Sequence, residues 1–365
     1  MWARFLLLLI FFSFQPFAHE VPMQRLNLLA KGINIPHWYW MRSPDTLLRD
    51  YIQDDDIEIL IKLGIKHVRI PFEMDDLDKP RVIKRLKMDI QRFVDQKVGV
   101  IVSAFGMKYN RDLISSPLGL KRLQDLSNVL KDTPPNFVFI QIANEPLPDK
   151  PETWSLVQNK LIEEVRKILP DHTLITSTPL KFDSSPEGWN TITAFQNMQP
   201  HDDQNIVYAV HFYEPYLFTH QNAEWDRNTR FIKHLAYPTD KANAQRVISQ
   251  LPKNTPLWIS QSLINSWDKE KLRHVLEPIL TWRDKHQRPV MFTEFGVYKV
   301  HVDTDSRYRW LKDIISLFQD EKFLWTFWSY SGGFGLFDTN DGFRTLDIDT
   351  AKALGFIVED LAMAP

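Results

Sequence analysis

The chain has 365 residues, and its 44 Lys and Arg residues nearly balance its 46 Asp and Glu residues, for a formal charge of −2. This balance excludes nucleic acid as the main partner, because surfaces that bind nucleic acid are strongly basic. The chain contains no Cys, which excludes a disulfide framework, a thiolate nucleophile and a Cys-bound metal site. Hydrophobic residues make up 44% and charged residues 25% of the chain, a composition typical of a globular protein rather than a disordered one.

The N-terminus has the pattern of a signal peptide. Arg4 precedes an apolar run at 5–14 that is too short to span a bilayer, and the small residue Ala18 follows. We therefore expect residues 1–18 to be removed on export, which leaves a secreted or periplasmic domain at 19–365 with no stable membrane insertion. An uncleaved membrane anchor is the alternative that this pattern leaves open.

Short apolar runs recur along the rest of the chain, each about as long as a buried strand. Several are continuously apolar, as parallel strands are when both faces of their sheet are covered. The eight runs are Leu28–Ile35, Lys66–Phe72, Val98–Phe105, Phe137–Asn144, Thr173–Thr178, Ile206–Tyr213, Pro289–Gly296 and Phe323–Tyr330.

Helical patterns separate most of these runs. Apolar residues recur at steps of three and four, and the stretches that show this lie at 57–61, 82–93, 120–130, 154–168 and 310–318. The acidic run at 54–56 is typical of a helix start. Eight alternations of strand and helix predict an α/β fold, the (β/α)8 TIM barrel, as a single domain with an enlarged loop after strand six, at 214–266. A doubly wound sheet is the alternative, but the chain lacks a glycine-rich phosphate-binding segment.

Two glutamates, Glu145 and Glu294, follow apolar runs at predicted strand ends. A carboxylate in such a place costs free energy unless it is paired, hydrogen-bonded or functional. The carboxyl ends of barrel strands meet at one mouth, so we expect the two side chains to face each other. Such a dyad can cleave a glycosidic bond. The alternative is that each glutamate only pairs with a buried Arg such as Arg69.

Motifs around these residues resemble one enzyme family. They stand in chain order at the predicted strand ends: GIN at 32–34, VRIPF at 68–72, IQIANEP at 140–146, VHFYEP at 210–215, MFTEFG at 291–296 and FWSYSGGFGLFD at 327–338. Together they resemble glycoside hydrolase family 5, the cellulase-like family, over nearly all of 19–365. The resemblance implies a retaining β-glycosidase that hydrolyses β-linked glucan or a related hexose polysaccharide by double displacement.

The same resemblance implies roles for individual residues, with no metal and no cofactor. Glu145 would be the general acid/base and Glu294 the nucleophile. Asn144 would hold the sugar 2-hydroxyl, and Arg69 would keep the nucleophile ionised. His211 and Tyr213 would line the reacting subsite, with Tyr213 steering the nucleophile, and Trp328 would be the aromatic platform beneath the sugar ring.

The end of strand one and the aromatic cluster after it add three candidates. We place Asn34, His37 and Trp38 among the substrate-binding residues, the aromatic ones as a sugar platform at a neighbouring subsite. The alternative for the cluster is a packed barrel rim. Trp225 and Trp258 in the enlarged loop are weaker candidates for ligand contact.

One departure from the family pattern concerns strand three. Family members often carry a His at its end, but this chain has no His between His67 and His172. Ser103, Phe105 and Tyr109 are the candidates for that space.

An oligo- or polysaccharide is thus the expected partner, and we expect a monomer. A non-catalytic carbohydrate-binding protein on the same barrel and an enzyme that is mainly a transglycosylase are the alternatives. The run 201–203 contains one His and two Asp, but neither a His-x-His strand end nor an HExxH motif occurs, so we interpret it as a solvated loop rather than a metal site.

Overall fold

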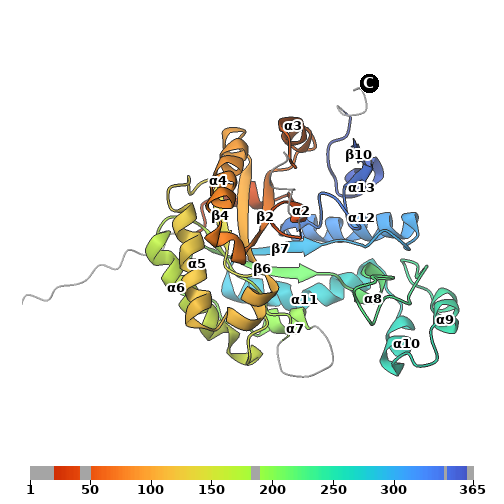
Figure 1. The fold of residues 1–365 in the computed structure, drawn as a ribbon. Coiled ribbons are helices and arrows are strands. Elements are labelled where there is room, and N and C mark those ends of the chain that lie inside the picture. Colours follow the sequence, from red (N-terminus) through yellow and green to blue (C-terminus); the bar gives the residue numbers. More distant parts are fainter. Residues whose placement is uncertain (1–19, 42–50, 182–189, 341–342, 360–365) are drawn as a thin grey trace, which may run out of the picture.

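A computed structural model describes residues 20–41, 51–181, 190–340 and 343–359 of the chain. Eight parallel strands close into a barrel in sequence order (Figure 1). They are β1 (Gly32–Asn34), β2 (His67–Glu73), β3 (Gly99–Phe105), β4 (Val138–Gln141), β5 (Leu174–Ile175), β6 (Ile206–Phe212), β7 (Val290–Phe295) and β8 (Leu324–Phe327). Each strand lies on one of the eight apolar runs, so the predicted (β/α)8 barrel is confirmed. The signal peptide expected at 1–18 lies outside the described residues.

The register of the strands closes the barrel and places one irregularity near its mouth. β1 pairs with both β2 and β8, so the sheet has no free edge. The pairing of β6 with β7 shifts between Val210 and His211, which brings His211 opposite Glu294. A shift of this kind re-aims the side chains that follow it.

Helices cover the outside of the barrel. The larger ones are α3 (Asp54–Lys62), α4 (Pro80–Asp95), α5 (Pro117–Leu130), α6 (Trp154–Ile168), α11 (Lys269–His286) and α12 (Thr304–Asp320). The smaller ones are α2 (Pro36–Tyr39), α7 (Thr191–Gln196) and α13 (Ile348–Ala353), with short helical turns at 74–78, 108–113 and 151–153. On α4 the buried residues Val82, Leu86, Ile90 and Phe93 form the stripe that the sequence pattern predicts. None of the helices in the described ranges is long and apolar enough to cross a membrane.

A short helix closes the amino end of the barrel. The apolar run that begins at Leu28 was expected to be strand throughout, but its first residues end α1 (Met23–Leu29), and β1 starts only at Gly32. Leu29 has no exposed surface and packs in one cluster with residues from the barrel interior, among them Ile101, Phe139 and Met291. The helix therefore buries apolar side chains that the barrel alone would leave open to water at this end.

The enlarged loop after β6 carries three small helices, α8 (Tyr216–Thr219), α9 (Lys241–Ser249) and α10 (Leu257–Leu263). In Figure 1 they lie beyond the carboxyl end of β6, on the side to which the strand arrows point. After β8, the strands β9 (Phe337–Asn340) and β10 (Phe343–Leu346) form an antiparallel hairpin. The enlarged loop thus extends the barrel at its mouth.

Candidate active site

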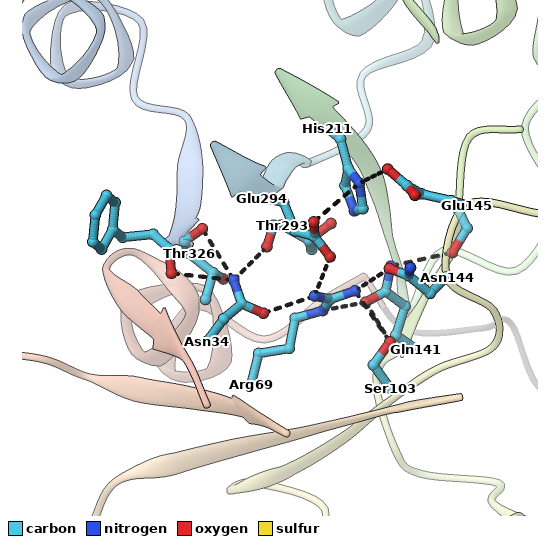
Figure 2. Close-up of polar contacts among 12 residues, drawn as sticks. Asn34, Arg69, Ser103, Gln141, Asn144, Glu145, His211, Thr293, Glu294 and Thr326 are labelled. Carbon is cyan, nitrogen blue, oxygen red and sulfur yellow. Dashed lines mark hydrogen bonds and ion pairs between the residues drawn. The ribbon is translucent and has the colours of Figure 1, made fainter. Parts of the chain in front are cut away.

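A buried arginine organises the mouth of the barrel (Figure 2). Arg69 on β2 has no exposed surface, and all five of its N–H donors find acceptors. Nη1 donates to Glu294 at 2.8 Å and to Asn34 at 2.7 Å, while Nε donates to Gln141 at 2.6 Å. Nη2 donates to Asn144 at 2.7 Å and to Ser103 at 3.2 Å. One fixed cation therefore joins groups from strands β1, β2, β3, β4 and β7.

The side chains around this cation are themselves held in place. The Asn34 amide donates to the backbone carbonyls of Thr293 and Phe327, at 2.9 and 3.2 Å, so it orients its oxygen toward Arg69. The Gln141 oxygen also accepts from Ser103 at 3.0 Å, and its amide donates to Ser177 at 3.1 Å. A buried polar network in which most members are satisfied is rigid.

Glu294 is held as a buried carboxylate on β7, with 5% of its surface exposed. One oxygen accepts from Arg69, and the other accepts from the Tyr213 hydroxyl at 3.1 Å. Burial, together with the negative charges of Glu294 and Glu145, raises the pKa of Tyr213 well above its ordinary value, so the phenol stays neutral and donates its proton. These two bonds fix the direction of the carboxylate across the mouth.

Glu145 follows β4 and is the more accessible carboxylate, with 27% of its side chain exposed. Its backbone has φ +44°, in the left-handed region that residues other than glycine rarely adopt. Such a conformation costs on the order of 1–3 kcal/mol and persists where the surroundings enforce it. The N–H of the preceding Asn144 is anchored by the Asn110 side chain at 3.1 Å.

His211 lies between the two carboxylates. Its Nδ1 is 2.8 Å from a Glu145 oxygen and 3.5 Å from a Glu294 oxygen. Because ionised carboxylates only accept hydrogen bonds, a proton on Nδ1 is what allows this contact, and Nδ1 donates it to Glu145, the nearer partner. The ring therefore orients the exposed carboxylate toward the buried one.

The two carboxylates meet as the sequence predicts. Glu145, His211 and Glu294 each place one polar atom within 4.8 Å of the others. That spacing would also suit a metal ion, but these atoms already have hydrogen-bond partners within the protein. His211 contacts both carboxylates, and Arg69 and Tyr213 donate to the oxygens of Glu294. The arrangement is a carboxylate pair with one member fixed and buried and the other open to solvent.

Three aromatic rings form a wall beside this pair. Trp328 directly follows β8 and is half-buried, and its ring is 6.2 Å from that of Trp40. Trp40 in turn is 4.8 Å from Phe105 at the end of β3, and Phe105 lies 5.0 Å below the Arg69 guanidinium. The position of Trp328 agrees with a platform that faces the mouth.

Two of the predicted substrate-binding residues expose no surface to a substrate, and those predictions are wrong. Trp38 has no exposed surface and packs against Tyr39 and Phe93, so it offers no face to a sugar. Asn34 is also fully buried, and both ends of its amide are used within the protein. Of the aromatic cluster, Trp40 is the residue whose ring approaches Trp328, whereas Trp38 and Tyr39, in the helical turn α2 before it, are both fully buried.

His37 occupies an intermediate position. It is half-buried, its ring lies against Gly332 in the loop after β8, and burial lowers its pKa.

The end of strand three, where the family pattern expects a His, has three candidate residues for that position, and each has a different place in the structure. Phe105 lies under Arg69, Ser103 belongs to the buried network, and the Tyr109 hydroxyl donates to the Ile142 carbonyl at 3.0 Å.

The network around Arg69 contains residues that the sequence analysis missed. Gln141 and Ser177 support the site, although neither was a candidate residue. Ser103, a candidate only for the space of the strand-three His, belongs to the same network. Gln141 and Ser103 each interrupt an apolar strand run, a signal that could have identified them, because a buried polar group needs a partner. Ser177 stands in a run that also contains three Thr residues, so this signal does not single it out. The run at 201–203 has a different role, since Asp203 pairs with Arg166 at 2.6 Å.

Comparisons with known proteins agree with this architecture. A family model described as Cellulase (glycosyl hydrolase family 5) matches residues 29–333. Endoglucanase C of Acetivibrio thermocellus is 26% identical over 323 residues, which cover 82% of this chain and 90% of that protein. Endoglucanase 3 of Fibrobacter succinogenes is 24% identical and matches 92% of this chain, but the chain spans only 54% of that protein's length.

Solved structures with the same fold include the endoglucanase Cel5A of the hyperthermophile Thermotoga maritima. Its TM-score is 0.70 at 24% identity, covering 92% of this chain and 99% of that one. Structures of that enzyme have been determined in complex with cellobiose and with mannotriose.

Proposed function

The chain belongs to the cellulase family, glycosyl hydrolase family 5, and is a glycoside hydrolase; from this premise we propose that it is a retaining enzyme that cleaves β-linked glucan by double displacement. Glu294 would be the nucleophile and Glu145 the general acid/base. Membership of a hydrolase family favours catalysis over the alternative of a non-catalytic carbohydrate-binding protein.

The separation of the two carboxylates carries the proposal. Retaining glycosidases hold their carboxyl groups about 5–5.5 Å apart, whereas inverting enzymes need about 6.5–9.5 Å to fit a water molecule between carboxylate and sugar. Here oxygens of Glu145 and Glu294 lie within 4.8 Å. This spacing supports direct attack by a carboxylate on the sugar.

The first step uses the difference between the two carboxylates. Glu294, ionised and aligned by Arg69 and Tyr213, attacks the anomeric carbon and forms a covalent ester. The bond from that carbon to the glycosidic oxygen breaks, and Glu145 gives its proton to the departing oxygen. Because Glu145 is the solvent-exposed member of the pair, it can meet the leaving group and later the water.

The second step reverses the first with water as the acceptor. Glu145, now ionised, takes a proton from water, whose oxygen attacks the anomeric carbon and releases Glu294. In the described part of the chain the amide nitrogen of Asn144 has no protein partner, whereas its oxygen accepts from Arg69. The amide is thus able to donate to the sugar 2-hydroxyl, a bond that strengthens in the transition state.

The names of the relatives point to the substrate. Four of the matched curated relatives are different endoglucanases, and a further one is a cellodextrinase from Ruminococcus flavefaciens. We therefore propose a β-glucan as the substrate class, with mannan as the comparison polymer because the Thermotoga enzyme has been solved with mannotriose. An enzyme that mainly transfers glycosyl groups would use the same dyad. Product analysis with an added sugar acceptor distinguishes hydrolysis from transglycosylation.

The proposed mechanism is tested by the stereochemistry of the first product and by variants of both glutamates. We expect NMR of a β-glucan digest to show the β-anomer first. Glu294→Gln should lower kcat about 10³-fold or more, and Glu145→Gln should lower it strongly on glucan but less on an aryl glycoside whose leaving group needs no proton. Glu163→Gln on the exposed face of α6 is the matched control and should keep full activity. An α-anomer as the first product, or near-normal turnover by Glu294→Gln, would overturn the proposal.

A further inference from the structure

We propose that Trp225 and Tyr298 form a distal aromatic platform that binds a sugar ring of the same glucan chain, beyond the units at the cleaved bond. The inference rests on the proposed function, because it extends that substrate outward from the mouth. It assigns a binding role to part of the enlarged loop after β6.

Trp225 is an unusually open aromatic residue. Its exposed fraction is 64%, and its ring meets that of Tyr298 edge-on, at 4.9 Å and an angle of 81°. The indole N–H has no partner among the described residues. Exposing so large an apolar surface costs free energy that burial would recover, and a pyranose ring with its C–H face supplies a surface of matching size.

The turn that carries Trp225 is rigid. The Asn222 N–H donates to the Thr229 carbonyl at 2.9 Å and closes the turn at its base. The Asp226 side chain accepts from the Tyr216 hydroxyl at 2.6 Å and from the Asn228 N–H at 2.7 Å. A ligand that stacks on a ring already held in place loses little conformational entropy on ordering it. The exposure of Trp225 is therefore a property of an ordered surface.

Tyr298 is positioned by two neighbouring loops. Its N–H donates to the Thr219 carbonyl at 2.8 Å, and the next N–H, of Lys299, donates to the Gly333 carbonyl at 2.8 Å. A Cβ atom at Gly333 would lie only 2.0 Å from the Tyr298 ring, so only glycine permits this close approach. Loops that follow β6, β7 and β8 thus converge on the platform.

A row of rings connects the platform to the reaction centre. Tyr298 contacts Phe334 at 5.4 Å, and Phe334 contacts Tyr213 at 6.1 Å. The Tyr213 hydroxyl donates to Glu294. Trp225 is therefore three ring contacts from the nucleophile's hydrogen-bond partner, a span that a short oligosaccharide can bridge. This continuity points to the substrate chain itself as the occupant.

The second tryptophan of the enlarged loop provides a matched control. Trp258, at the start of α10, has an exposed fraction of 47%, but within the described ranges it has no ring contact that leads toward the mouth. If exposed aromatic surface alone mattered, the two residues would behave alike. A platform that belongs to the substrate path predicts that only Trp225 matters.

The test compares a long and a short substrate. Trp225→Ala should lower kcat/KM on cellohexaose about tenfold, mainly through KM, and change kcat/KM on an aryl β-cellobioside less than twofold. Trp225→Phe should keep most of the activity, and Trp258→Ala should match the wild type on both substrates. Tryptophan fluorescence of the slow variant Glu145→Gln, titrated with cellohexaose, should show weaker binding when Trp225 is also replaced.

The outcomes separate the two proposals. Equal effects of Trp225→Ala on both substrates, or no effect on either, would overturn the platform while the proposed function stands. If the wild-type enzyme cleaves mannohexaose and not cellohexaose, the proposed glucan substrate is wrong, and the same comparison with mannohexaose tests the platform. If it cleaves none of these substrates, the proposed function fails and the platform fails with it.

Discussion

The two ends of the barrel are built from the same strands but differ in chemistry. On β2, His67 and Arg69 are two residues apart, so both side chains point into the barrel, one layer above the other. Around His67 the interior is apolar, whereas around Arg69 it is polar and charged. The amino end can therefore serve stability while the carboxyl end serves chemistry.

His67 is a buried ionisable group that is kept neutral. Its Nδ1 lies 2.9 Å from the Leu28 carbonyl and must donate to it, which leaves Nε2 to accept from the Thr326 hydroxyl at 2.8 Å. An added Cβ at Gly32 would overlap the ring, so the glycine makes room for it. Burial lowers the pKa of His67 to about 4, and the nearby Arg69 cation acts in the same direction.

At the carboxyl end, charge is retained because every donor of the cation is used. Burial lowers the pKa of Arg69 and the Glu294 carboxylate raises it, but guanidinium remains charged in proteins. A buried ion pair is a weak source of net stability, since desolvation offsets much of the attraction. A single layer of side chains at one end of a common scaffold therefore supplies the reactive groups. Three experiments test this division between the two ends.

The largest effect is expected from Arg69→Lys. Lysine has three donors on a compact cation and cannot reproduce five bonds in a fixed plane, so Glu294 loses its alignment and several buried acceptors lose their partner. We expect kcat/KM to fall about 10³-fold, in line with the roughly 3–5 kcal/mol measured when buried ion pairs are broken. Arg122→Lys, which changes a surface pair with Asp78, should alter neither kcat/KM nor the melting temperature measurably. Normal turnover by Arg69→Lys would show that the charged layer is dispensable.

The next effect concerns the amino end and appears as pH-dependent stability. The unfolded chain takes up the His67 proton near pH 6.5 and the folded chain only near pH 4, so the folded state loses stability as pH falls through this window. The loss from this residue is about 3 kcal/mol. Denaturant unfolding at pH 7 and pH 4 should show a smaller loss in His67→Gln than in the wild type.

Other histidines contribute to the pH dependence that remains, among them His37, whose pKa burial also lowers. Burial lowers the pKa of His172 to about 4 and that of His220 to about 3, so both contribute in the same direction and His67→Gln keeps part of the dependence. His274→Gln on the exposed face of α11 should match the wild type. An unchanged pH dependence in His67→Gln would mean that the buried layer does not hold this ring neutral.

The smallest effect is expected from Tyr213→Phe. The change removes one hydrogen bond to the Glu294 carboxylate, worth about 2 kcal/mol when the acceptor is charged, so kcat should fall about thirtyfold. Because the raised pKa keeps this phenol neutral, the alkaline side of the pH–rate profile should not change. Tyr208→Phe, which removes a bond to the His201 N–H near the amino end, should lower stability and leave kcat intact. The reverse result for these two tyrosines would contradict the division of roles between the ends.

Much of the fold could be predicted because its signals are local. The apolar runs and the helical stripes report burial on one or both faces. They predicted all eight strands and the helices α3, α4, α5, α6 and α12, but not α11. The main error, at Leu28, arose because a short apolar segment does not distinguish a strand from the end of a buried helix. The two glutamates were also predictable, because a carboxylate after a buried strand costs free energy unless it is paired, hydrogen-bonded or functional.

Which residue types stand at the strand ends could be predicted from local sequence, because side-chain period and composition are properties of neighbouring residues. Folding in three dimensions was needed to show that Trp40 rather than Trp38 lies beside Trp328, that Asn34 turns inward to Arg69, and that Gln141 joins the same network. These outcomes depend on contacts between residues far apart in the chain. Closing the barrel brings such residues within hydrogen-bond distance, and a buried polar group then takes the partner that the geometry offers.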